Sequence, residues 1–279
     1  MQNCLTEIFN NIKPIIGMVH LRPLPGSPLY DKINMPMQKV IELAVQEATI
    51  LEEAGVDGIQ VENIWDYPYN KGEDVGYETC AALTATALAV NQSVSIPVGI
   101  NCHLNGGHAA MAAAVAAGAR WIRVFEFVGA YISYTGLTEG IGGALARYRK
   151  FLNANDIYFL CDVNVKHGSH FIVSDRSVNE LAIDAQEQGA DALIITGFET
   201  GTAPDEIKVR DCKKTVSLPI LLGSGVTLDN ADSLLGVTDG AIVGSWFKKD
   251  NNWRNPVDFE RAKAFMDEIK KVRLKTDGV

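Results

Sequence analysis

The sequence lacks long hydrophobic runs and lacks clustered positive charge. No apolar stretch approaches the roughly 18 residues that a membrane-spanning helix needs, so integral membrane association is not expected. Acidic and basic residues are interspersed, and the formal net charge is −9. Because nucleic acids and anionic lipid surfaces attract clustered Lys and Arg, neither is an expected partner.

Cysteines are few, and they are scattered without a Cys-x-x-Cys pair. This spacing argues against a disulfide framework or a zinc site and is typical of reduced thiols, which predicts a cytoplasmic protein. The sequence also contains neither a Gly-x-Ser-x-Gly nucleophile elbow nor a Walker loop, which disfavours an ester hydrolase or a P-loop ATPase. The cysteines are Cys4, Cys80, Cys102, Cys161 and Cys212.

What the sequence does contain is an alternation of short apolar runs with longer helical patterns over 279 residues. The alternation predicts an α/β fold with a parallel sheet, and this length fits one (β/α)8 TIM barrel as a single domain over residues 1–279. The expected strands are Ile15–Leu21, Gly58–Asn63, Pro97–His103, Trp121–Phe127, Ile157–Val165, Ala192–Thr196 and the runs that begin at Pro219 and Gly240.

Helices are expected between these strands, and several carry recognisable ends. Gly55, Gly118 and Gly189 each stand a few residues before a strand, as helix-ending glycines do in short αβ loops. Ser177 and Glu180 have the spacing of a capping box. The expected helices are about 37–54, 78–90, 108–117, one ending near Leu152, 177–189, one beginning near Pro204, 229–235 and one from Pro256 onward.

Two segments fall outside this repeating pattern. Residues 1–13 precede the first strand and are expected to form a lead-in to the barrel. Residues 129–143 form a polar connection that is long for a compact domain. We therefore expect this connection to be a lid.

Two glycine turns follow the last two expected strands. Pro219–Gly225 ends in Gly223-Ser224-Gly225, and Gly240–Ser245 ends in Gly244-Ser245. In (β/α)8 barrels the loops after strands seven and eight commonly bind phosphate through uncovered backbone amides. The paired placement predicts a phosphate site of this type, and two ordinary strand-ending turns are the alternative.

The fifth strand carries the densest group of polar residues. Side chains alternate along a strand, which places Asp162, Asn164 and Lys166 on one face, pointing into the barrel mouth. A lysine there can bind phosphate, act as a base or form a Schiff base, with Asp162 tuning it. The alternative is an ion pair between Lys166 and Asp162 that only holds the strand end. A loop that begins at His167 would let this side chain turn inward.

Glu62 ends the second strand, where a buried carboxylate costs several kcal/mol unless it is paired. We expect it to meet Lys166, Arg123 or a metal. Glu62 and Asp162, together with Asn101, could supply oxygen ligands to Mg²⁺, the usual companion of phosphates. No Cys/His cluster indicates a transition-metal site.

Two histidines and one charged pair complete the polar candidates at the strand ends. His20 lies before a proline-stiffened loop and is a stronger proton-transfer candidate than His103, with a structural role as the alternative for both. Arg123 and Glu126 lie on opposite faces of a regular strand, so one of them is expected at the surface or between helices.

Aromatic residues gather in the loops at the expected mouth. We expect them to mediate self-association into a homo-oligomer, and stacking on a ligand ring is the alternative. They are Trp65, Tyr67, Tyr69, Tyr131 and Tyr134.

Five segments together resemble the BtpA/SgcQ family: the twelve residues from Gly17 to Pro28, 61–63, 162–167, 223–227 and 255–258. The resemblance implies a TIM-type barrel in one of two contexts, photosystem I biogenesis or sugar-uptake and sugar-phosphate gene sets. The chain departs from the family pattern at Asn164, where a His is expected, and near Leu104, where an Arg is expected. The family's motif positions fall on His20, Glu62, Asn63, Asn101, Asp162, Lys166, His167, Gly223, Ser224, Gly225, Gly244 and Ser245.

Two functions follow from these observations. The first is an enzyme of the isomerase, epimerase or aldolase type that acts on a small phosphorylated sugar or nucleoside-like compound. Lys166, Asp162, Glu62 and His20 would be its catalytic residues, and Asn63, Asn101, Asn164, His167 and Thr196 would bind substrate beside the glycine turns. The second is a non-enzymatic assembly or regulatory factor of the photosystem I biogenesis type. Fold analogy does not choose between them.

Overall fold

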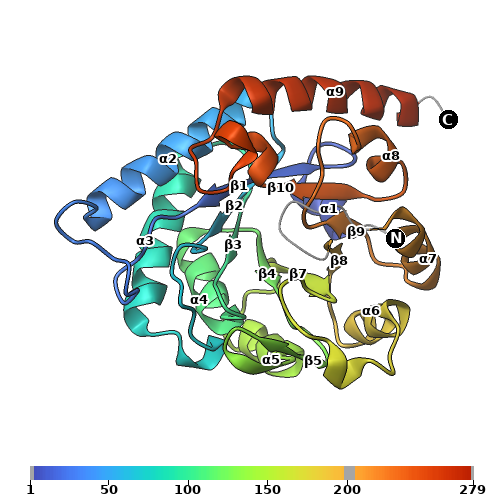
Figure 1. Cartoon of the computed structure of the whole chain (residues 1–279), viewed down its shortest axis with the longest axis horizontal. Coiled ribbons are helices and arrows are strands. Elements are labelled where there is room, and N and C mark those ends of the chain that lie inside the picture. The colour runs from blue at the N-terminus through green and yellow to red at the C-terminus, as the bar shows by residue number, and fades with distance from the viewer. Residues whose placement is uncertain (1–2, 198–204, 278–279) are drawn as a thin grey trace.

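Eight parallel strands close into a barrel in the computed structural model, which describes residues 3–197 and 205–277 (Figure 1). Around the barrel the strand order is β1, β2, β3, β4, β7, β8, β9, β10 and back to β1. The predicted (β/α)8 fold is therefore confirmed. The strands are β1 (Ile15–His20), β2 (Gly58–Glu62), β3 (Val98–Asn101), β4 (Trp121–Val124), β7 (Tyr158–Val163), β8 (Ala192–Ile195), β9 (Ile220–Leu222) and β10 (Gly240–Val243).

Helices surround the barrel on its outside, as Figure 1 shows. They are α2 (Met37–Ala54), α3 (Tyr77–Ser93), α4 (Gly107–Ala117), α5 (Gly142–Phe151), α6 (Val178–Glu187), α7 (Glu206–Thr215), α8 (Ala231–Gly236) and α9 (Phe259–Asp277), with single turns η1 (Gly72–Asp74), η2 (Phe171–Val173), η3 (Ser245–Phe247) and η4 (Lys249–Asn251). No helix in the described ranges is long and apolar enough to cross a bilayer. The predicted helix start near Pro204 lies outside the described residues.

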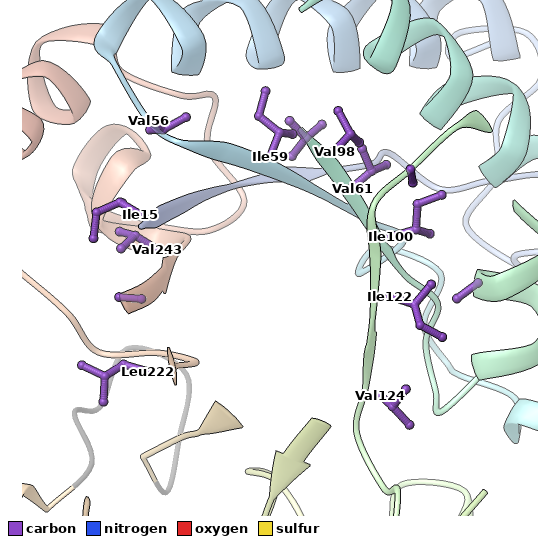
Figure 2. Close-up of a cluster of buried hydrophobic side chains, with 14 of the residues drawn as sticks. Ile15, Val56, Ile59, Val61, Val98, Ile100, Ile122, Val124, Leu222 and Val243 are labelled. Carbon is purple, nitrogen blue, oxygen red and sulfur yellow. The ribbon is translucent and has the colours of Figure 1, made fainter. Parts of the chain in front are cut away.

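The strands bury their outward faces against these helices. Ile59, Val61 and Ile100 are fully buried in this layer, and Figure 2 shows them with Val98 between strands and helices. Such β-branched residues pack well on a pleated surface. Removing apolar surface from water stabilises a fold by about 25 cal/mol per Å². This layer is therefore the main contribution to the stability of the fold.

The lead-in closes the N-terminal end of the barrel. It contains α1 (Cys4–Ile8), whose buried side chains join those of Phe9 and the inward-facing strand residues in one apolar cluster. The rings of Phe9 and Trp121 lie 5.4 Å apart. Gly99 makes room for this arrangement, since a Cβ there would lie 2.0 Å from the Trp121 ring. The interior of this end is therefore filled by side chains.

The predicted helix ends are confirmed. Gly55, Gly118 and Gly189 all have left-handed φ values of 96°, 73° and 93°, which glycine adopts without steric cost. Ser177 and Glu180 form the predicted capping box at the start of α6. These ends set the short connections at the N-terminal side of the barrel.

Several strands end earlier than predicted. β3 ends at Asn101, β4 at Val124 and β7 at Val163. The apolar pattern continues past these points because Phe125 and Val165 pack with one another in a separate cluster at the mouth, not on a neighbouring strand. The side chains after each strand end therefore need not alternate between the two faces of the sheet.

The connection 129–143 contains an antiparallel hairpin of β5 (Ala130–Ser133) and β6 (Gly136–Glu139), followed by the start of α5. Reciprocal backbone hydrogen bonds of 2.9 Å join Ile132 and Ser169, which fixes the hairpin to the loop after β7. Tyr131 of β5 is buried. Closure of this hairpin as a lid stays a prediction.

Candidate active site

Polar side chains form a row at the C-terminal ends of neighbouring strands. In the barrel register His20 pairs with Glu62, and Glu62 pairs with Asn101. Glu62 and Asn101 are buried. Because side chains paired across neighbouring parallel strands lie on the same side of the sheet, the three residues are neighbours at the C-terminal end of the barrel.

Glu62 makes its hydrogen bonds to residues that the sequence prediction did not name as its partners. His103 Nε2 donates to its Oε1 over 2.9 Å, and Asn101 Nδ2 donates to Oε2 over 3.0 Å. Burial alone would raise the pKa of Glu62, but the charge and hydrogen bond of the His103 imidazole lower it below its ordinary value. Glu62 is thus held as a carboxylate.

Arg123 is the partner of Asp162. Its Nε and Nη2 atoms donate to the two carboxylate oxygens over 2.7 and 2.8 Å, a bidentate pair that is buried on both sides. The predicted alternative of a Lys166–Asp162 ion pair is therefore wrong. Neither Arg123 nor Glu126 lies at the surface, because both side chains are buried, and the alternative that one of them lies between helices stays a prediction.

Lys166 lies between these charged groups without a direct bond to them. Within the described part of the chain, its Nζ makes no hydrogen bond or ion pair. Burial and the charge of Arg123 lower the pKa of Lys166 to about 8, against the attraction of Glu62 and Asp162. A substantial neutral fraction of this amine therefore exists near neutral pH.

The predicted Mg²⁺ pair does not fit the carboxylates as they are placed. All four oxygens of Glu62 and Asp162 already accept hydrogen bonds from protein donors, and the guanidinium of Arg123 lies against Asp162. In residues 3–197 and 205–277, no group of three or more His, Cys, Asp or Glu side chains is arranged to hold a metal. We therefore assign no step to a resident metal.

The two glycine turns line one small cavity, which we call the amide cavity. It has a volume of ≈ 60 Å³ and is bounded by residues 223–227 and 244–246, with Lys166 and Arg123 beside them. Among the described residues, the N–H groups of Gly225 and Val226 donate no hydrogen bond, and neither do those of Ser245 and Trp246. The volume holds roughly four water positions, the space of a small tetrahedral anion.

A larger cavity of ≈ 540 Å³, which we call the aromatic cavity, adjoins the amide cavity. The two share Glu62, Ile64, Arg123, Lys166 and Trp253. Its other walls are mainly aromatic side chains from the loops after β2, β3 and β4 and from the hairpin. Most of these rings are predicted from the sequence to lie at the mouth, but Phe125 and Trp253 are not.

His20 lines the amide cavity in a neutral state. Burial, with the charge of Lys248, lowers its pKa to about 3. Its Nδ1 donates to the carbonyl oxygen of Trp253 over 3.2 Å, which fixes the ring against the loop after β10. A proton shuttle at His20 would have to use the neutral imidazole.

The remaining candidates are spread over several environments. Asn164 has a left-handed φ of 58°, which ends the predicted alternation, and its side chain is exposed outside both cavities. The Asn63 amide hydrogen bonds to Asp66 and to the His103 backbone. His167 lines the aromatic cavity, and Thr196 is buried at the end of β8.

Ser224 is held at the base of the amide cavity. Its hydroxyl oxygen accepts a hydrogen bond from the Gly197 N–H over 3.3 Å. Gly223 must be a glycine, because a Cβ there would lie 2.5 Å from Ile194 and 3.0 Å from Arg123. The turn after β9 is therefore brought close to the buried charges.

The closed barrel with its charged strand ends is a single-domain (β/α)8 barrel, the fold of phosphate-binding TIM-barrel enzymes. It matches the solved structure of N-(5'-phosphoribosyl)anthranilate isomerase from Pyrococcus furiosus with a TM-score of 0.57, covering 93% of this chain and 99% of that chain. At 12% identity this likeness shows the fold alone. The chain belongs to the BtpA family, whose sequence profile matches residues 11–271.

Relatives within the family are similar over almost their whole length. An uncharacterised protein of Thermococcus kodakarensis is 40% identical over 262 residues, which cover 94% of this chain and 97% of that protein. The photosystem I biogenesis protein BtpA of Synechocystis is 37% identical over 268 residues, covering 94% of this chain and 90% of that protein. The family resemblance seen in the sequence is confirmed.

Proposed function

We propose that this chain is an enzyme that acts on a small phosphorylated, carbonyl-containing substrate by isomerase or lyase chemistry. The observation that carries the proposal is the placement of Lys166, an amine without a bonded partner in the described residues, between the amide cavity and the aromatic cavity. A phosphate in the amide cavity would place the carbon chain of the substrate beside this amine.

Lys166 would act in one of two ways. As a base, its neutral Nζ removes a proton from the carbon next to the carbonyl, and the resulting enolate is stabilised by the neighbouring positive charge of Arg123. As a nucleophile, Nζ adds to the carbonyl carbon and water leaves, which gives a Schiff base that accepts electrons when an adjacent C–H or C–C bond breaks. Both routes need the lowered pKa.

Proton exchange tests both routes without knowledge of the product. We expect NMR to show exchange of the proton next to the carbonyl when the protein is incubated in D₂O with ketose or aldose phosphates. Lys166→Met should abolish this exchange while the fold survives. Borohydride reduction separates the routes, because only the Schiff base leaves a covalent adduct at Lys166, visible by peptide mass.

The amide cavity has its own test in ligand-induced stabilisation. A phosphorylated ligand at about one hundred times its dissociation constant should stabilise the fold by roughly 2.7 kcal/mol. Ser224→Asp should remove this effect through charge repulsion. Gln92→Glu, at an exposed position on α3, adds the same charge away from the cavity and should leave the effect intact. Absence of any shift with phosphate or sugar phosphates would remove the basis of the proposal.

The name of the Synechocystis relative supports a second candidate, a role in assembly or regulation without turnover. In that case Lys166→Met should leave biological activity intact in a strain that depends on this protein. The enzyme proposal predicts that the same variant loses activity at normal protein abundance.

A further inference from the structure

We propose that the substrate carries a planar aromatic ring attached to its phosphorylated sugar, and that the aromatic cavity holds this ring. This inference rests on the proposed function, because it takes the amide cavity as the phosphate site. A volume of ≈ 540 Å³ is in the range of cavities that enclose whole small-molecule ligands.

The walls of the aromatic cavity present ring surfaces. Tyr69 stacks on His103 with ring centres 4.7 Å apart and an interplanar angle of 26°, and Phe125 meets His103 edge-on at 4.9 Å. The Tyr69 hydroxyl already donates to the Ile64 carbonyl oxygen over 2.7 Å. These groups provide stacking and apolar contact but few hydrogen-bond partners for sugar hydroxyls.

Tyr134 has the placement of a side chain that stacks on a ligand. It lies at the tip of the hairpin, is 69% exposed and lines the aromatic cavity. Its closest ring contacts, Tyr69 and His167, are both 6.3 Å away and tilted. An exposed aromatic side chain at a cavity rim gains most when a planar partner covers it.

Charge divides the combined site into three parts. The charged groups Glu62, Arg123 and Lys166 lie where the two cavities meet, since they line both. The amide cavity lies on one side of them and the aromatic walls on the other. A substrate that fits this order has phosphate at one end, the reacting carbons in the middle and a ring at the other end.

The test compares probes that differ by one part at a time: inorganic phosphate, ribose 5-phosphate, uridine and the nucleotides UMP and AMP. Binding is measured by isothermal titration calorimetry. Because a base stacked on an aromatic side chain contributes substantially to affinity, we expect a nucleotide to bind about tenfold or more tightly than ribose 5-phosphate. Tyr134→Ala should remove about tenfold of nucleotide affinity and leave ribose 5-phosphate within about twofold.

Two further variants control this comparison. Tyr134→Trp keeps a stacking ring and should retain nucleotide binding. Tyr77→Ala removes a tyrosine that is 94% exposed on α3 and lines neither cavity, so it should change no affinity. Nucleotide binding no tighter than ribose 5-phosphate binding, or an equal loss for both in Tyr134→Ala, would overturn the inference and leave the proposed function standing.

Two other outcomes would also overturn the inference. If uridine binds with sensitivity to Tyr134 while inorganic phosphate and ribose 5-phosphate fail and UMP binds no more tightly than uridine, the phosphate site is wrong, and the inference of a ring on a phosphorylated sugar is overturned with it. If ring-bearing probes fail and Tyr134→Ala converts an oligomer to a monomer in gel filtration, the aromatic cavity is a subunit interface and the inference is overturned.

Discussion

The surroundings of Lys166 in the fold disfavour the protonated form of its amine relative to water. The backbone after β7 turns at Asn164, and this turn returns Lys166 to the mouth. There burial and the charge of Arg123 lower the pKa of the amine to about 8, although the carboxylates of Glu62 and Asp162 act in the opposite direction. At pH 7 about one tenth of the molecules then carry the neutral amine.

This titration can be measured without a substrate. After isotope-labelled reductive methylation of the lysines, we expect one methyl resonance in NMR to titrate near pH 8, whereas exposed lysines titrate near their ordinary value of about 10.4. The resonance should be absent from Lys166→Arg. A Lys166 resonance that titrates with the exposed lysines would contradict the assigned environment.

The same lowered pKa predicts an effect on stability. Between pH 8 and 10.5 the unfolded chain binds more protons at this lysine than the folded chain, so the free energy of unfolding rises with pH in this window. Lys166→Met should therefore be more stable than the wild type at pH 7, by roughly 1–3 kcal/mol, and this gain should disappear as pH approaches 10.5. Urea denaturation at a series of pH values measures it; a Met variant that is less stable at pH 7 would refute it.

At the scale of the elements, one hydrogen-bonding arrangement joins three pairs of neighbouring strands. An aspartate just before β2, β8 and β10 accepts from a backbone N–H at the start of the preceding barrel strand and donates its own N–H to the carbonyl oxygen of the same residue. Asp57 exchanges these bonds with Ile15 at 2.7 and 2.9 Å, and Asp191 with Phe159 at 2.7 and 3.0 Å. Asp239 does so with Ile220 at 2.8 Å in both directions. Each pair fixes the register at the N-terminal end of the barrel.

Asp57→Ala should be destabilising, because it leaves the buried N–H of Ile15 and the guanidinium of Arg273 without this acceptor. We expect a loss of about 1–3 kcal/mol in the free energy of unfolding, measured by chemical denaturation. Asp232→Ala is the matched control, since its ion pair with Lys275 is more than half exposed on both sides and should contribute less than about 1 kcal/mol. Equal effects of the two variants would argue against the strand-joining role.

The sequence predicted the strands, the helix ends and the turns, because these depend on local pattern. Two of the helix-ending glycines, Gly55 and Gly189, are followed two residues later by Asp57 and Asp191, whereas Gly118 is followed by Arg120 at the same position. Side-chain partners were predicted less well because they depend on where a strand ends. Asp162 pairs with Arg123 and not with Lys166, and Glu62 pairs with His103. The position of each strand end and the register between strands decide these contacts.

At the scale of the whole molecule, the two ends of the barrel differ in the side chains that they hold. The N-terminal end is packed with apolar side chains from α1 and the strands, and Trp121 donates to Gln60 at 3.2 Å above this packing. The C-terminal end holds the charged groups and both cavities. The packed layer that stabilises the barrel is therefore separate from the layer that holds the candidate site.

Phe9→Ala tests this separation. Phe9 is buried against Trp121, so its truncation should cost about 3–5 kcal/mol of folding stability. Ligand affinity at the mouth should stay within about twofold of the wild type once the protein is folded. Ile12→Ala, at a 43% exposed position nearby, should change stability by less than about 0.5 kcal/mol. A binding defect in folded Phe9→Ala would show that the two ends are coupled.

Because α1 and its neighbours pack the N-terminal end of the barrel, the amide cavity and the aromatic cavity both lie at the C-terminal end, and the larger one is lined by the hairpin. Under the proposed function, product would leave by the opening through which the next substrate arrives. We then expect product to compete with substrate for entry, and the residence time of ligand beside Tyr134 to limit turnover.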